Sequence, residues 1–582
     1  MFDFLYAEKA RPFLVVGSIM ALLACSSTSS SSGKDGGSNS SGKDGGANTG
    51  GPDGSTSGDS GTLYDATNAN GDGPSPDASS TLPDGSPGVD GTASAGNIVR
   101  TVAYHQITAL MASPTSAAVM SRNGKTIAFA VAPGNEDPAN PNKIFVVNSD
   151  GTGLKQVDSY VSRCFCGSMV AISDDGQTIV STESMQVRVV GADGTLKGKV
   201  EIDSNEINEL AISGNGQKVF FVSGRDPHLV GTSSVVPRGV SSFNADGSGL
   251  ALIAGAQAVA TLTGVMAADV FTFGVCAQTL GVSTDGSHVV FGTKLNKMGD
   301  VLLGSAGDGS NLHVIAGPIP NSTPGIGVIS GGVSGDGTKA FYRVEKNDGS
   351  RQVRVADFAG GNDKLVADKP PMSFCASPIQ ITSNGSQILL GESARMYPTA
   401  GGDPISLLQR TGYYSSDPPL VGEGVGADPL MTLADDGKHF AYLALDKANI
   451  KQIATAELNP AATGSAPSVG GVTITPPMIS LGGASTTVAA TVTSGGTLLR
   501  VGTALFLAGV EDTNDSTDAI VLLDDGKAPD AVAGDHVYTG TGIHVGAVGT
   551  SGARLVRVKA EATSSDGMRH ATAVDATGLS VQ

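Results

Sequence analysis

Four cysteines in the body of the chain are the residues whose type and spacing most clearly allow chemistry. They are Cys164, Cys166, Cys276 and Cys375. Three of them stand ten residues before a glycine of a recurrent turn, in the pairs Cys166 with Gly176, Cys276 with Gly286 and Cys375 with Gly385. Equal spacing predicts equivalent places in a repeating fold. In an exported protein two disulfides are the first interpretation, with Cys164 and Cys166 each reaching one of the other two. A soft-metal thiolate site and buried free thiols are the alternatives.

An acidic stretch near the C-terminus offers a set of oxygen ligands. Asp524, Asp525, Asp530 and Asp535 lie within twelve residues. Carboxylates suit Ca²⁺, which takes several oxygen ligands in flexible geometry, although this spacing is not that of an EF-hand loop. The alternative is local, because an Asp-Gly turn uses its carboxylate to accept backbone hydrogen bonds. We expect a weak calcium site here and no other cofactor.

The composition excludes several classes of function. The net charge of −19 argues against a nucleic-acid partner, because phosphate binding needs clustered Lys and Arg. The sequence contains no His-Glu-x-x-His zinc-protease motif and no Gly-x-Ser-x-Gly nucleophile elbow. Abundant glycine, with 81 residues, and few aromatics favour short strands joined by tight turns.

The elements that position these residues come from one repeated turn. Each copy places Asp-Gly or Asn-Gly between apolar stretches, which predicts a β-hairpin because such pairs supply the positive φ of a tight turn. The glycines of the seven copies are Gly124, Gly176, Gly216, Gly286, Gly337, Gly385 and Gly437. They span 313 residues over six intervals, or about 52 each. That period is typical of a propeller, in which one repeat is one four-stranded blade.

A second turn follows the first in several copies, at Asp150-Gly151, Asp193-Gly194, Asp246-Gly247 and Asp308-Gly309. Together the two motifs resemble the TolB-type propeller repeat over about residues 98–460. The resemblance implies a seven-bladed β-propeller. In such a fold the three equivalent cysteines would stand where the chain enters the innermost strands, near the mouth of the central channel.

The ends of the repeat region predict how the ring closes. After the seventh turn we expect a second strand at Lys438–Leu445 and a third near Gln452–Leu458, but no fourth. The strand Asn97–Tyr104 precedes the first turn. We therefore expect it to pair into the last blade, which removes open sheet edges. A separate leading strand is the alternative.

The N-terminus carries an export signal. Lys9 and Arg11 precede an apolar run, Phe13 to Ala24, that is too short to span a bilayer comfortably and ends at Cys25. This pattern resembles the bacterial lipoprotein signal, which implies cleavage after residue 24 and lipidation of Cys25. Ser26 follows, where an aspartate would resemble an inner-membrane retention signal, so we expect anchoring in the outer membrane, on the periplasmic or the cell-surface side. Residues 25–96 are rich in Ser, Gly and Asp and predict a disordered tether.

The remaining chain predicts a second, smaller β domain. A linker at 461–467 leads into residues 468–582, where seven strands suggest an Ig-like β-sandwich. The expected strands are Val472–Thr475, Thr486–Thr493, Leu498–Phe506, Ala519–Leu523, His536–Thr539, Arg554–Glu561 and His570–Val574. The acidic stretch of this region resembles a loop of Ig-like modules in bacterial surface proteins. The expected fold class is thus all-β: tether, propeller at 97–460, then sandwich.

Three functions remain open. The first is a lipid-anchored binding or scaffold protein of the cell envelope that contacts a protein, peptide or glycan. The second is a propeller hydrolase or lyase with catalytic residues lining the channel, and the third is a structural surface component. Charged residues gathered around the axis would favour the enzyme, whereas an apolar or glycine-rich lining would favour binding.

Overall fold

The computed structural model describes residues 99–582 with gaps, and the structural statements below concern these residues. The gaps are 115, 132–141, 161–168, 183–185, 203–206, 225, 227, 233, 271–279, 296–298, 320–327, 346–350, 369–378, 391–394, 403, 407–430, 446–449, 460–465, 508–509, 512–519 and 565–568. The predicted signal peptide 1–24 and tether 25–96 lie outside this part of the chain. Within it, no helix has the length and apolar character needed to cross a bilayer.

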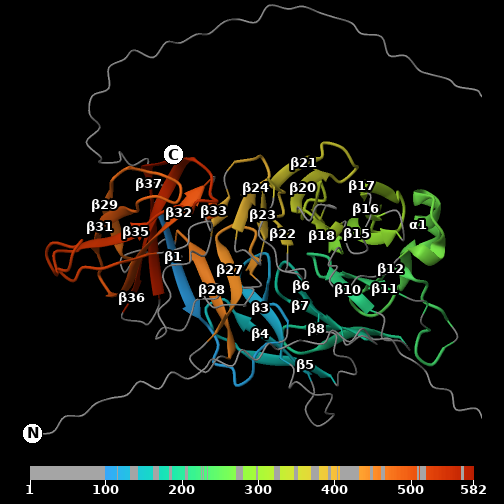
Figure 1. The fold of residues 1–582 in the computed structure, drawn as a ribbon. Coiled ribbons are helices and arrows are strands. Elements are labelled where there is room, and N and C mark those ends of the chain that lie inside the picture. Colours follow the sequence, from blue (N-terminus) through green and yellow to red (C-terminus); the bar gives the residue numbers. More distant parts are fainter. Residues whose placement is uncertain are drawn as a thin grey trace, which may run out of the picture. The chain divides into compact units, whose positions relative to one another are not determined.

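Six antiparallel sheets of four strands each follow one another along the described chain (Figure 1). The first two contain β2 (Val119–Met120), β3 (Thr126–Val131), β4 (Asn142–Asn148) and β5 (Lys155–Tyr160), then β6 (Met169–Ile172), β7 (Thr178–Thr182), β8 (Gln186–Gly191) and β9 (Leu196–Glu201). The next two contain β10 (Ile207–Ile212), β11 (Lys218–Ser223), β12 (Gly239–Asn244) and β13 (Ala251–Gly255), then β14 (Gly281–Val282), β15 (His288–Leu295), β16 (Gly299–Ala306) and β17 (His313–Ile319). The last two contain β18 (Val328–Val333), β19 (Lys339–Glu345), β20 (Arg351–Asp357) and β21 (Lys364–Asp368), then β22 (Ile379–Ile381), β23 (Gln387–Leu390), β24 (Arg395–Pro398) and β25 (Ile405–Ser406). Sheets of this kind are typical of β-propeller blades.

The repeated turn owes its shape to a side-chain clasp. In the fourth copy Ser283 Oγ donates to Asp285 Oδ1 at 2.7 Å and accepts from the His288 backbone N–H at 3.0 Å, while Gly286 has φ 73°. The same Ser or Thr to Asp or Asn bond occurs in the other five of the first six turns. Burial raises the pKa of Asp285, but hydrogen bonds from Ser283 and Ser287 outweigh burial and lower it to about 2. The Asp or Asn at the third position of these turns therefore has a local role.

A seventh group of strands closes the repeat region. It contains β26 (Thr432–Leu433), β27 (His439–Leu445), β28 (Lys451–Leu458) and β1 (Val99–Gln106). β1 pairs antiparallel with β28, from Val102 opposite Leu458 to Gln106 opposite Ala454. The predicted pairing of the leading strand with the last repeat is confirmed.

Hydrogen bonds link the seven turns to one another in sequence order and back to the start. The last link runs from the Asp435 backbone N–H to the Arg122 carbonyl at 2.8 Å. The other links are Asn123 to Asp174, Asp174 to Gly214, Asn215 to Thr284, Thr284 to Gly335, Asp336 to Ser383 and Ser383 to the Asp435 carboxylate. The first strands of the seven groups are thus held around one axis.

The C-terminal module, residues 468–582, forms two packed sets of strands. One sheet contains β29 (Ser468–Thr475), β31 (Thr486–Thr493) and β35 (Val537–Ile543). The other set contains β30 (Met478–Ile479), β32 (Thr497–Leu507), β33 (Val510–Glu511), β34 (Ile520–Leu522), β36 (Gly552–Thr563) and β37 (Arg569–Val581). An apolar core that includes Val488, Val501 and Val558 lies between them. All seven predicted strands are present, β31 with the predicted bounds and the other six with shifted ends, whereas β30 and β33 were not predicted.

One connection was not predicted at all. β37 pairs antiparallel with β1, on the edge opposite β28, so that one sheet runs from β26 through β1 into the C-terminal module (Figure 1). A second unpredicted feature is helix α1 (Ala256–Thr263) with the short 3₁₀ helix η1 (Ala267–Asp269) between the third and fourth sheets. The helix packs Val259 and Ala260 into the neighbouring core.

Candidate functional site

A cavity of about 210 Å³ lies where the first strands of all seven groups meet. Residues of β2, β6, β10, β14, β18, β22 and β26 line it. Most lining residues are apolar or glycine, among them Ala171, Ala211, Gly281 and Gly332. The cavity is therefore narrow and mostly uncharged along the strands.

Small residues and polar side chains shape the wall of the cavity. A Cβ on Gly281 would lie 2.5 Å from the Gly332 Cα, so glycine is what lets β14 and β18 approach so closely. On the wall, Gln380 Oε1 accepts from the Leu433 backbone N–H at 2.7 Å. Behind it, the buried Thr432 Oγ1 donates to the Ala118 carbonyl at 2.6 Å. Because the first strands are sheet edges, these side chains satisfy backbone groups that would otherwise face the axis.

Charged residues gather at the end of the cavity where the turns lie. Arg122 Nε lies 3.3 Å from Asp174 Oδ1, and Arg122 Nη1 lies 3.0 Å from Asp435 Oδ1. Arg122 Nη1 also donates to Ser383 Oγ at 2.8 Å, while Thr284 Oγ1 donates to Asp174 Oδ2 at 2.8 Å. We call these five residues the polar cluster. Each is the second residue of its turn, which places all five around the axis.

Two glycines at the same turn position make the polar cluster possible. A Cβ on Gly214 would lie 1.9 Å from Asp174 Oδ2, and a Cβ on Gly335 would lie 2.3 Å from Ser383 Oγ. Neither distance leaves room for a side chain. The Asp174 carboxylate of the second copy can therefore pass over Gly214 of the third to reach Thr284 of the fourth.

The electrostatics of the polar cluster are those of a self-paired group. Burial raises the pKa of Asp174, and the Arg122 guanidinium and the Thr284 hydroxyl oppose that rise. Both carboxylates accept bonds from Arg122 and from hydroxyl groups, so the charges of the cluster are paired with one another. The cavity therefore meets both criteria named above, because its wall is mostly apolar or glycine and its turn end carries Arg122, Asp174 and Asp435 around the axis.

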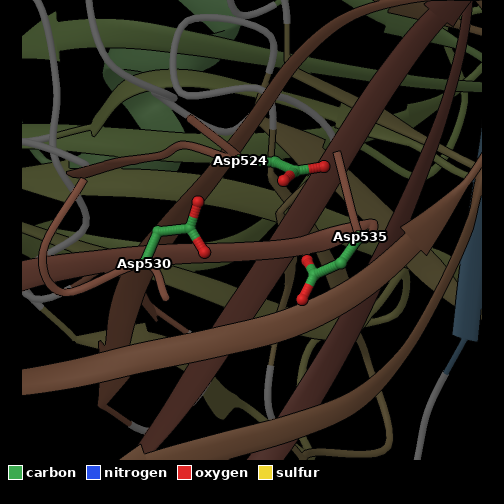
Figure 2. A group of neighbouring side chains, drawn as sticks. All are labelled: Asp524, Asp530 and Asp535. Carbon is green, nitrogen blue, oxygen red and sulfur yellow. The ribbon is translucent and has the colours of Figure 1, made fainter. Parts of the chain in front are cut away.

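The structure brings together three of the four predicted calcium ligands (Figure 2). One carboxylate oxygen each from Asp524, Asp530 and Asp535 lie within 4.8 Å of one another. Asp525 is not in the group, and its carboxylate lies 3.1 Å from Lys527 Nζ.

Backbone donors hold the three carboxylates in place. Asp524 accepts from the backbone N–H groups of Gly534 at 2.6 Å and His536 at 3.0 Å. Asp530, which is buried, accepts from Gly526 at 2.5 Å. Asp535 accepts from Val537 at 2.9 Å. These bonds are the local alternative that the sequence predicted, and they still leave oxygen atoms facing one another.

The remaining predicted sites lie outside the described residues. These are the lipidation site Cys25 and the disulfide candidates Cys164, Cys166, Cys276 and Cys375. The polar cluster was not predicted from the sequence. Its signal was the variable second position of the seven turns, which is charged in three copies, Ser or Thr in two and Gly in two.

Comparison with known proteins gives structural likeness only. No family model and no curated protein matches the chain. An oligogalacturonate lyase in complex with manganese matches with 11% identity and a TM-score of 0.38, covering 62% of this chain and 91% of that chain. TolB from Acinetobacter baumannii matches with 11% identity and a TM-score of 0.30, covering 58% and 65%. The C-terminal WD40 domain of Sif2 matches with 12% identity and a TM-score of 0.33, covering 61% and 98%. These are β-propeller proteins.

Proposed function

We propose that the chain is an exported, lipid-anchored binding protein of the cell envelope, built on a seven-bladed β-propeller with an Ig-like C-terminal module. The observation that supports it most is the cavity, which the first strands of all seven groups line and whose charged residues are paired with one another. The ring of hydrogen bonds between the turns supports the blade number. A protein, peptide or glycan of the envelope is the proposed partner.

A pull-down from outer-membrane extract tests the binding role. Ala171 lines the cavity, and Ala171→Leu narrows it without changing charge. The matched control is Ala251→Leu, the same substitution at an exposed position of the outer strand β13. We expect the wild-type protein and the control to enrich the same partner and Ala171→Leu to lose it. Specific enrichment by none of the three would favour a structural surface component. Equal enrichment by all three would move the binding site away from the cavity.

Two further measurements test the export part of the proposal. A fatty-acid analogue should label the wild-type protein and fail to label Cys25→Ala. Mass mapping without reduction should find Cys164 and Cys166 each linked to Cys276 or Cys375. Absence of label would remove the anchor, and four free thiols would remove the disulfides.

The acidic group in the C-terminal module supports a second role, that of a structural calcium site. Three carboxylates with oxygen atoms within 4.8 Å suit a cation that takes six to eight oxygen ligands. Calorimetric titration with Ca²⁺ should show binding that Asp535→Asn weakens at least about tenfold. Asp525→Asn is the matched control, since its carboxylate lies outside the group, and it should bind as the wild type does. No binding heat, together with a melting temperature that Ca²⁺ leaves unchanged, would contradict the site.

A further inference from the structure

The closing strand β1 differs from every strand in the equivalent place. In the other six sheets the fourth strand is β5, β9, β13, β17, β21 or β25, and each ends its sheet within the described residues. β1 is the fourth strand of the closing group, yet it is paired along both edges. An unpaired strand edge leaves its N–H and C=O groups to solvent. Among the described fourth strands, β1 is therefore the one that is hydrogen-bonded along both edges.

The second ladder of β1 is at least as long as the first. β1 pairs with β28 over five residues and with β37 over six, from Val99 opposite Val574 to Tyr104 opposite Arg569. Val102, Ala103 and Tyr104 take part in both ladders and are buried.

Side chains reinforce the contact between the C-terminal module and β1. Ala571 of β37 belongs to the same apolar cluster as Val102 and Tyr104 of β1, and this cluster extends to Leu433 at the cavity. Lys559 Nζ lies 5.5 Å from the centre of the Tyr104 ring. Glu561 holds Lys559 in place, with Glu561 Oε1 2.5 Å from Lys559 Nζ. Arg500 in turn holds Glu561, with Arg500 Nε 2.9 Å from Glu561 Oε2.

We propose that the C-terminal module is a clamp that keeps the ring of blades closed by holding β1 along its outer edge. The chain enters β1 at Val99, so a pull on the preceding segment would act along the strand. Both ladders have hydrogen bonds perpendicular to the strand, so that such a pull loads all of them together. This mechanical consequence rests on the proposed anchor at Cys25, whereas the clamp itself does not.

Hydrogen exchange on the full chain tests the clamp without any substitution. The amides of β1 should exchange at least about tenfold more slowly than those of β5, β9 and β21, and at rates similar to those of β27. If β1 exchanges as fast as the other fourth strands, the clamp is refuted. Failure of fatty-acid labelling would leave this comparison unchanged, so the two proposals fail separately.

A pair of variants on one strand adds a second readout. Ala571 and Ala576 both lie on β37 and are each 1% exposed, but only Ala571 lies opposite β1, whereas Ala576 packs in the core of the C-terminal module. Ala571→Gly therefore removes a buried methyl group that faces β1. Ala576→Gly removes an equally buried methyl group that does not. We expect Ala571→Gly to speed exchange of β1 several-fold and Ala576→Gly to leave it close to the wild-type rate.

Equal effects of the two substitutions on β1 would overturn the proposal. The same pair, pulled from the N-terminus in single-molecule experiments, should show a lower opening force for β1 in Ala571→Gly only.

Discussion

Replacing Arg122 by methionine is the sharpest test of the polar cluster. The guanidinium pairs with Asp174 at 3.3 Å and with Asp435 at 3.0 Å, and these side chains are a quarter to a third exposed. A buried hydrogen bond to a charged group contributes about 1.5–3 kcal/mol to stability. Because these side chains are partly exposed, we assign about 1 kcal/mol to each of the two ion pairs of Arg122. Arg122→Met is therefore expected to lower the free energy of unfolding by about 2 kcal/mol at neutral pH.

The loss should depend on pH in a defined direction. Burial already raises the pKa of Asp174 above its ordinary value, and removing Arg122 removes the main opposing charge. A carboxyl group whose folded-state pKa is raised adds stability when protonated, below its unfolded pKa, and loses that contribution as pH rises through the folded pKa. The deficit of Arg122→Met should thus shrink at about pH 4.5 compared with neutral pH.

The assay is urea unfolding followed by circular dichroism, since the chain has no tryptophan. Lys199→Met is the matched control, because it breaks an ion pair with Glu201 whose side chains are 47% and 37% exposed. The control should change the unfolding free energy by less than about 0.5 kcal/mol. Equal losses in Arg122→Met and Lys199→Met, or a loss independent of pH, would refute the account of the cluster.

Three other predictions concern single residues. Burial would raise the pKa of Glu561, but the Lys559 ammonium and the Arg500 guanidinium lower this pKa from 4.5 to about 2. The ionised carboxylate therefore stabilises the fold above pH 4.5, and this stabilisation should disappear as pH falls toward 2 in thermal melts of the wild-type protein. In Glu561→Gln it should be absent at every pH. Thr572 has a buried hydroxyl that finds no hydrogen-bond partner among the described residues, so Thr572→Val should raise the free energy of unfolding by about 1 kcal/mol. Thr486→Val, which removes a hydroxyl bonded to the Pro476 carbonyl, should lower it. Gly214→Ala should lower the free energy of unfolding in urea by about 1–3 kcal/mol, because the new Cβ would lie 1.9 Å from Asp174 Oδ2. Gly470→Ala is the control and should lower it less, because a Cβ on Gly470 would have no described atom within 4 Å.

The repeated turn could be predicted from the sequence because the interactions that shape each turn lie within the turn. The clasp of Ser283 and Asp285 and the positive φ of Gly286 are contained within a few residues, so that the pattern carries its own geometry. The closure by β1 was readable for a different reason, because the last copy lacked a fourth strand and one unassigned strand remained.

The junction with β37 and the polar cluster were not readable in the same way. The alternation of apolar and polar residues in β37 does not indicate which strand pairs with its edge, because that partner, β1, is more than 450 residues away in the chain. The polar cluster depends on Arg122 and Asp435, which stand at opposite ends of the repeat region and meet only when the ring closes. In the acidic stretch, spacing brought Asp524 and Asp530 together, but Asp525 is bound to Lys527 instead.

The position of β1 also sets the order in which the chain can fold. The strand is the first described element to be synthesised, yet its partners are Lys451–Leu458 and Arg569–Val581. Contacts between segments so distant in sequence form slowly, because long loops must close before the pairing stabilises anything. The ring can therefore not be completed on a growing chain before Lys451–Leu458 has been synthesised. On a growing chain β1 therefore gains its partner β28 first and stays without its second partner until Arg569–Val581 has followed.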